Sequence, residues 1–158
     1  MSEERRFSHL DERGEARMVD VSEKPVTRRV ARASCRLLLS SATLDRLSEL
    51  PKGDALAVAR LAGIQASKRT SEWIPLAHPL PLDRVVIDFA RRADGLEIAS
   101  EVVATARTGA EMEALVACAA AALALYDMVK AVERGATVTD LRLEAKSGGA
   151  RGDWQRDE

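Results

Sequence analysis

The clearest alternation of polar and apolar positions runs from Val26 to Leu39. Every second side chain there is mostly small or apolar, and arginine recurs at the positions between. A period of two residues is typical of a β-strand that buries one face and exposes the other. Arg29 falls on the apolar register. We therefore predict a strand over 26–39 that directs one arginine toward the interior.

Two helices are predicted after this strand. Ser40 or Ser41 is suited to cap a short helix over 43–50. Asp54 is suited to cap a longer helix over 55–69, in which small side chains predominate.

Residues 72–82 contain three prolines and are expected to form an extended loop, because the residue before a proline resists the helical conformation. Alternating apolar positions then predict two strands, over 84–91 and 96–106. Ala93-Asp94-Gly95 lies between them and predicts the turn of a hairpin.

A long helix is predicted next. Thr108 is suited to be its N-cap, and Gly135 would end it after Arg134. A last strand is predicted over 137–145, with one face formed by Leu141, Leu143 and Ala145.

This order of elements predicts an α+β fold of the ferredoxin-like split βαβ type, with an antiparallel sheet and helices packed on one face. We expect a flexible N-terminal arm over 1–25, one folded domain over 26–149 and a charged C-terminal tail over 150–158. Such a fold hosts many activities and does not by itself indicate one.

Composition and charge argue against several classes of function. The 158 residues suit one domain, and the formal net charge of −1 argues against a general nucleic-acid binder or a basic membrane-binding surface. The charged N-terminus cannot serve as a signal peptide, and the apolar run from Ala114 to Tyr126 is too short for a membrane span. Cys35 and Cys118 lack metal-binding or redox spacing. We expect a cytoplasmic protein with both thiols reduced.

The long helix carries the first candidate chemistry. Glu113, Asp127 and Lys130 share one stripe of this helix, with alanines between them. Asp127 and Lys130 form either a solvated ion pair or a carboxylate that orients a lysine for proton transfer. Glu113 lies about 21 Å from Asp127 along the axis, at about 1.5 Å per residue. The two cannot act on one small reacting centre within one subunit.

Three other segments could meet an anion. Lys146-Ser147-Gly148-Gly149 joins a cation to accessible backbone amides, although a flexible linker explains the glycines equally well. Lys52-Gly53-Asp54 places a cation beside a helix N-terminus, although a simple capped turn would look the same. His78 is either merely exposed or held rigidly enough to bind phosphate or move protons.

Taken together, these segments resemble the cyclic pyranopterin monophosphate synthases, the molybdenum-cofactor biosynthesis protein C family. The resemblance covers nearly the whole chain. The matching stretches are GEARMVDVSEK (14–24), KGDALAVARLAGIQASKRTSEWIPLAHPL (52–80), GAEMEALVACAAAALALYDMVKAV (109–132) and LEAKSGG (143–149).

The resemblance implies a lyase that converts 3′,8-cyclo-7,8-dihydroguanosine 5′-triphosphate to cyclic pyranopterin monophosphate and pyrophosphate. It also implies a ferredoxin-like fold and a homohexamer, a trimer of dimers, with sites at a subunit interface. No protein-bound cofactor is expected, although Mg²⁺ can accompany the substrate triphosphate. No metal-ligand cluster is found in the sequence.

Matching motifs imply the site residues. The implied catalytic residues are Asp127, Lys130 and Lys146. The implied substrate-binding residues are Lys52, Leu76, Ala77, His78, Glu111, Met112, Glu113 and Arg29. Relatives commonly have cysteine where this chain has Ala77, a change that a backbone contact would survive and a side-chain contact would not.

Two other classes of function are compatible with the predicted fold. A ferredoxin-like RNA-binding module would carry aromatic residues at alternating strand positions, and only Phe89 fits. A small-molecule regulatory domain would explain the fold and an oligomer without catalysis, but it would not need the pair formed by Asp127 and Lys130. A turnover assay separates it from an enzyme.

Overall fold

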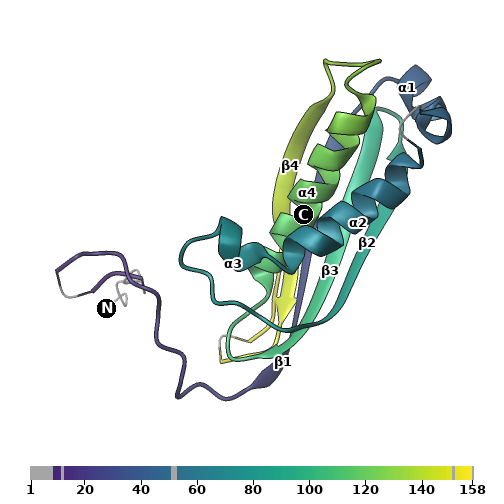
Figure 1. Ribbon diagram of the computed structural model, residues 1–158. Coiled ribbons are helices and arrows are strands. Elements are labelled where there is room, and N and C mark those ends of the chain that lie inside the picture. The colour runs from purple at the N-terminus through teal and green to yellow at the C-terminus, as the bar shows by residue number, and fades with distance from the viewer. Residues whose placement is uncertain (1–8, 12, 51–52, 151, 158) are drawn as a thin grey trace.

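The computed structural model describes residues 9–11, 13–50, 53–150 and 152–157 (Figure 1). Its strands are β1 (Thr27–Leu38), β2 (Leu82–Arg92), β3 (Gly95–Ala106), β4 (Thr137–Ser147) and β5 (Trp154–Gln155). Its helices are α1 (Ser41–Asp45), the 3₁₀ helix η1 (Leu47–Glu49), α2 (Ala55–Ser67), α3 (Thr70–Trp73) and α4 (Glu111–Val129).

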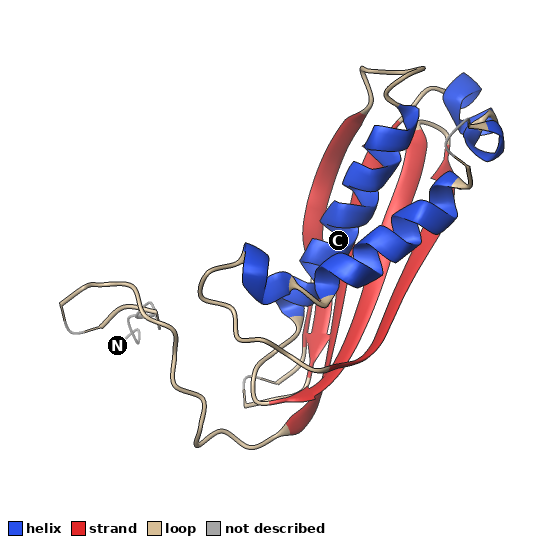
Figure 2. Cartoon of the chain, in the orientation of Figure 1, coloured by secondary structure: helices blue, strands red, loops and turns tan. Residues whose placement is uncertain are grey.

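The strands form one antiparallel sheet in the order β2-β3-β1-β4-β5. Helices α2 and α4 cover one face of this sheet (Figures 1 and 2). In the described part of the chain, no helix covers the other face. The predicted ferredoxin-like α+β fold is confirmed.

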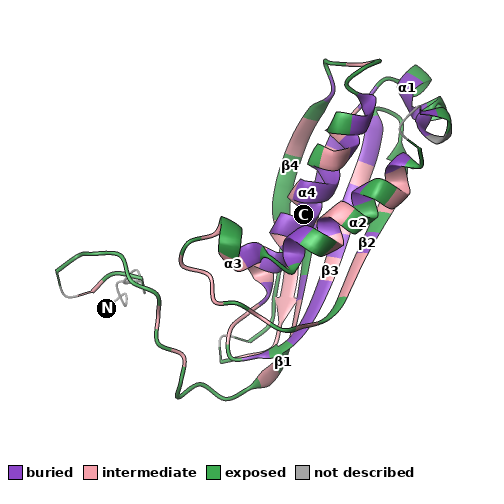
Figure 3. Ribbon diagram, in the orientation of Figure 1, coloured by how far each residue is buried: buried purple, intermediate pink, exposed green. Residues whose placement is uncertain are grey.

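The core lies between the sheet and these two helices (Figure 3). On β1 the alternate residues Ala31, Ala33, Cys35 and Leu37 are buried, as the period of two predicted. Cys118 of α4 is buried with them, so both thiols pack as small core side chains.

Small side chains let α2 lie close to α4. A Cβ on Gly63 would stand 2.7 Å from the Ala117 carbonyl oxygen and would overlap the Ile87 side chain. By length and composition alone, helix α4 could cross a membrane, although the apolar run from Ala114 to Tyr126 within it was predicted to be too short. Most of it is buried within this chain, which is the environment of a core helix.

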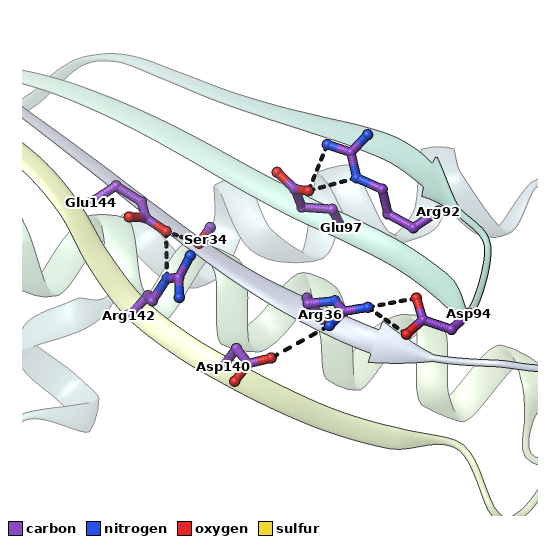
Figure 4. A network of polar contacts seen from close by, with 8 residues as sticks. All are labelled: Ser34, Arg36, Arg92, Asp94, Glu97, Asp140, Arg142 and Glu144. Atoms are coloured by element: carbon purple, nitrogen blue, oxygen red, sulfur yellow. Dashed lines mark hydrogen bonds and ion pairs between the residues drawn. The ribbon is translucent and has the colours of Figure 1, made fainter. Parts of the chain in front are cut away.

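The face of the sheet opposite the helices is a surface of ion pairs (Figure 4). Arg36 contacts Asp94 at 2.5 Å and Asp140 at 3.9 Å, and Arg92 contacts Glu97 at 2.7 Å. Exposed pairs of this kind contribute little to stability individually, so their main effect is to keep this face polar.

Some predicted helix boundaries were wrong. Asp54 does cap α2, since its carboxylate accepts from the Ala57 amide at 3.0 Å. Thr108 is not the cap of α4, because the first helical carbonyl is that of Ala110. Gly135 does not end the helix either. The Val129 carbonyl accepts two amides of the following turn, and the helix stops there.

Two further local predictions are only partly right. Ser40 is the cap of a helix over 41–45 that gives way to the 3₁₀ turn η1, so one helix over 43–50 does not form. The segment 72–82 is not extended from its start, because α3 continues to Trp73, ahead of the first proline.

The predicted face of the last strand is wrong because β4 contains bulges. Leu143 lies opposite Ala33 on the helix-covered face, whereas Ala145 lies opposite Arg32 on the other face. Leu141 is 46% exposed. An extra residue in one strand reverses the faces of all residues beyond it, and periodicity cannot reveal it.

Candidate active site

A cavity of about 860 Å³ lies at one end of the sheet, where five segments converge. They are the arm before β1, the start of β1, the loop after α3, the N-terminus of α4 and the loop after β4. Within the described residues, the predicted site residues that line it are Arg29, Leu76, Ala77, His78, Glu111, Met112, Glu113 and Lys146. The fold therefore gathers most of the predicted substrate contacts in one place.

Two glutamates from the first turn of α4, Glu111 and Glu113, line this cavity in different surroundings. Lys146 at the end of β4 places its ammonium nitrogen 3.2 Å from a carboxylate oxygen of Glu111. Glu113 is only 3% exposed. Burial raises the pKa of Glu113 to about 7, and the nearby charge of Glu111 adds to the shift. At neutral pH Glu113 can therefore either give or accept a proton.

Arg29 joins two of the loops that form the cavity. Its guanidinium donates to the carbonyl oxygens of Gly148 and Arg107, each at 3.3 Å. Its Nε is buried and has no hydrogen-bond partner in the described structure. Gly149 lies against the same guanidinium with φ +83°, a conformation that favours glycine. The Gly148-Gly149 turn is thus a fitted support for Arg29, which argues against a mere flexible linker.

The proline-rich loop contributes a second wall. The Ala77 amide donates to the Ile74 carbonyl at 3.0 Å, which closes a turn just after α3. His78 follows this turn and lines the cavity. Asp20 of the arm lies near enough to interact with His78, although the Ser22 amide is the main group that holds the pKa of Asp20 below its usual value.

Two cations of the cavity were missed from the sequence. Lys24 and Arg107 both line it, and Arg107 donates from Nε to the Lys24 carbonyl at 3.1 Å. Both residues lie in loops, where no periodicity marks them. With Arg29 and Lys146 they supply four cations against the carboxyl groups of two glutamates. An anionic ligand would offset this excess of positive charge.

Asp127 and Lys130 do not line this cavity; they lie at the opposite end of α4. Their side chains form an ion pair of 2.7 Å and are about half exposed, at 55% and 51%. The bond to Asp127 raises the pKa of Lys130. Within the single chain, the pair has the partial exposure and raised lysine pKa of a solvated ion pair. Lys52 lies outside the described residues.

The described residues contain no group of three or more histidine, cysteine, aspartate or glutamate side chains placed to hold a metal ion. The cavity instead combines cations with one carboxyl group that titrates near neutrality. That arrangement can bind a polyanion and exchange protons with it.

Comparison with known proteins agrees with this geometry. The model of the MoaC family matches residues 18–149. A protein of Streptomyces griseus subsp. griseus named cyclic pyranopterin monophosphate synthase is 52% identical over 158 residues, which are 99% of this chain and 89% of that protein. A protein of the same name from Thermomicrobium roseum is 54% identical over 156 residues, with 96% and 94% covered.

Proposed function

The chain belongs to the MoaC family, and we propose that it is a cyclic pyranopterin monophosphate synthase of molybdenum cofactor biosynthesis. As such it acts as a lyase that takes the cyclic dihydroguanosine triphosphate to cyclic pyranopterin monophosphate and pyrophosphate. The observation that carries the proposal is the convergence of the predicted substrate contacts on one cavity of about 860 Å³. Family membership supports the reaction, and the cavity is the proposed location of the active site.

In this proposal the cations hold the triphosphate. Arg29 of β1, Arg107 of the loop after β3 and Lys146 of β4 line the cavity. Arginine presents several N–H donors that match phosphate oxygens, and lysine supplies a compact charge. Closing the cyclic phosphate requires a substrate hydroxyl oxygen to attack the α-phosphorus while pyrophosphate leaves. Cations around the phosphates stabilise the charge that develops on the leaving group.

Glu113 is the proposed proton carrier within the cavity. Ring opening and pterin formation each require protons to move, and a carboxyl group with a pKa of about 7 is suited to both directions. His78 lines the same cavity, where its imidazole can hydrogen-bond to the substrate.

Asp127 and Lys130 take part only if a second copy of the chain brings them to this cavity. The family resemblance implies a homohexamer, and the helix layer of this chain supports contact between copies. Leu61 of α2 and Leu123 of α4 are 68% and 55% exposed, so the helix layer presents apolar side chains to a partner. A partner chain would also alter the surroundings of Lys130 and hence its pKa.

We propose a cytoplasmic location. Mg²⁺ is proposed only as a companion of the substrate triphosphate, since phosphate oxygens and water are its usual ligands.

The direct test is to incubate the purified chain with the cyclic dihydroguanosine triphosphate and to measure both products. We expect pyrophosphate and the pyranopterin in equal amounts. Binding of the triphosphate without either product would instead support a regulatory domain.

A further inference from the structure

A second cavity of about 650 Å³ lies beyond the main one, toward the helix-free face of the sheet. Three of its residues, Val30, Lys146 and Ser147, also line the main cavity. The two spaces therefore adjoin at the ends of β1 and β4. The residues that line only the second cavity are Arg28, Arg32, Arg84, Glu101, Ala145, Asp153, Trp154 and Gln155.

Strand register explains why arginines gather there. Arg32 lies opposite Glu101 on β3, and Arg84 of β2 lies opposite Val103, the residue two positions further along β3. Arg28 lies four residues before Arg32 on the same face of β1, with Val30 between them. Strands β1 and β2, on either side of β3, thus place three guanidinium groups around one depression.

The charges of this cavity are incompletely balanced. Glu101 contacts both Arg32, at 2.7 Å, and Arg84, so two guanidinium groups share one carboxylate. Arg32 is the main cause that lowers the pKa of Glu101. Arg28 forms no ion pair with any residue of the described chain. The carboxylate of Asp153 accepts from the Gly148 amide at 3.0 Å.

We propose that this outer cavity is a second binding site for a polyphosphate, such as inorganic pyrophosphate or the phosphate tail of a nucleotide. Arg32 and Arg84 each retain N–H donors that Glu101 does not use, and Arg28 adds a further set. Three guanidinium groups on two strands can meet several oxygens of one polyphosphate at once. The proposed reaction releases pyrophosphate, and to that extent the ligand class rests on the proposed function.

Equilibrium dialysis of labelled pyrophosphate against the full chain, at fixed ionic strength, tests the site. The double variant Arg28→Gln/Arg84→Gln is expected to bind one pyrophosphate fewer per chain than the unaltered protein. The matched control is Arg91→Gln/Arg92→Gln, which removes the same charge from β2 outside the cavity, where these arginines pair with Asp45 and Glu97. The control is expected to keep the full number.

A second variant protects the test against misfolding of the first. Ala145→Glu places a carboxylate in the outer cavity and should abolish the same binding event while the fold remains, as judged by circular dichroism. Equal binding by the unaltered protein and both outer-cavity variants would overturn the proposal, as would an equal loss in the Arg91/Arg92 control. This test does not depend on the main cavity. If the proposed reaction does not occur, the unaltered protein should still bind one pyrophosphate more per chain than the outer-cavity variants.

Competition identifies the source of the phosphate. Displacement of the outer pyrophosphate by GDP would assign the site to a nucleotide tail, whereas resistance to GDP would assign it to the inorganic ion. Displacement by guanosine, which has no phosphate, would overturn the proposal.

Discussion

The guanidinium of Arg29 occupies the space that a Cβ on Gly149 would need. This contact connects the Gly148-Gly149 end of the loop after β4 to the start of β1. Position 149 therefore requires glycine because a larger side chain would collide with Arg29, and a general need for loop flexibility is a less specific explanation.

Gly149→Ala is therefore expected to damage both stability and substrate binding. The positive φ of +83° costs an alanine about 1–2 kcal/mol, and the added methyl group displaces Arg29 from the cavity. Steady-state kinetics should show a KM raised at least tenfold. Gly152→Ala is the matched control, because Gly152 has φ +66° but open space around its Cα. A normal KM in Gly149→Ala would contradict the fitted-support interpretation.

Glu113 predicts an unusual dependence of stability on pH. Its pKa rises from 4.5 in the unfolded chain to about 7 in the folded one, so the folded state binds more protons between these values. The contribution is fully present below pH 4.5 and is lost as the pH rises through 7. The total loss is on the order of 3 kcal/mol.

Glu113→Gln should remove this loss. Denaturant unfolding at pH 5 and pH 8 should show a smaller decrease in the free energy of unfolding for the variant than for the unaltered protein. Glu72→Gln, which changes an exposed carboxyl group of α3, is the control and should keep the original decrease. Identical pH profiles for all three proteins would mean that Glu113 is not protonated in the folded state.

The sequence predicted the strands better than the site. Alternation located β1, β2 and β3 because each buries one face against the helices. It could not locate the bulges of β4, since an inserted residue leaves no compositional mark. Lys24 and Arg107 were missed because loops have no period, and the cavity forms only when loops distant in sequence meet.

The separation of Asp127 from the cavity predicts complementation between subunits. A Glu113→Ala chain lacks the buried carboxyl group, and an Asp127→Ala chain lacks the acid at the other end of α4. Mixed oligomers, formed by unfolding and refolding the two variants together, should recover part of the activity that each lacks alone. Recovery in no mixture, or an active monomer by light scattering, would rule out shared sites.

Lys146 and Lys130 should fail in different ways. Lys146 lies in the cavity beside Glu111, so Lys146→Ala should weaken substrate binding as well as turnover. Lys130 lies beside Asp127 at the other end of α4, so Lys130→Ala should mainly lower the chemical rate. Substrate affinity and the single-turnover rate separate the two effects. Unchanged affinity in Lys146→Ala would remove this lysine from the phosphate site.

The arm before β1 is expected to act as a cover for the cavity. Val19 and Val21 line the cavity, although their segment forms no helix or strand. The bond from Arg107 to the Lys24 carbonyl fixes the base of the arm. A segment with few apolar contacts of its own gains order mainly from what lies beneath it, so a bound substrate should hold it closed. Closure would also keep water from the opened ring.

Deleting residues 1–22 should accordingly leave folding and assembly intact and reduce turnover at least tenfold. The double substitution Val19→Ala/Val21→Ala keeps the length of the arm and removes only its apolar contacts, so it should cause a smaller reduction of the same kind. Hydrogen exchange of residues 15–22 with and without a substrate analogue measures the closure directly. We expect strong protection only in the bound state, because most residues in the described part of the arm are exposed. Equal protection in both states would show that the arm is a fixed part of the fold.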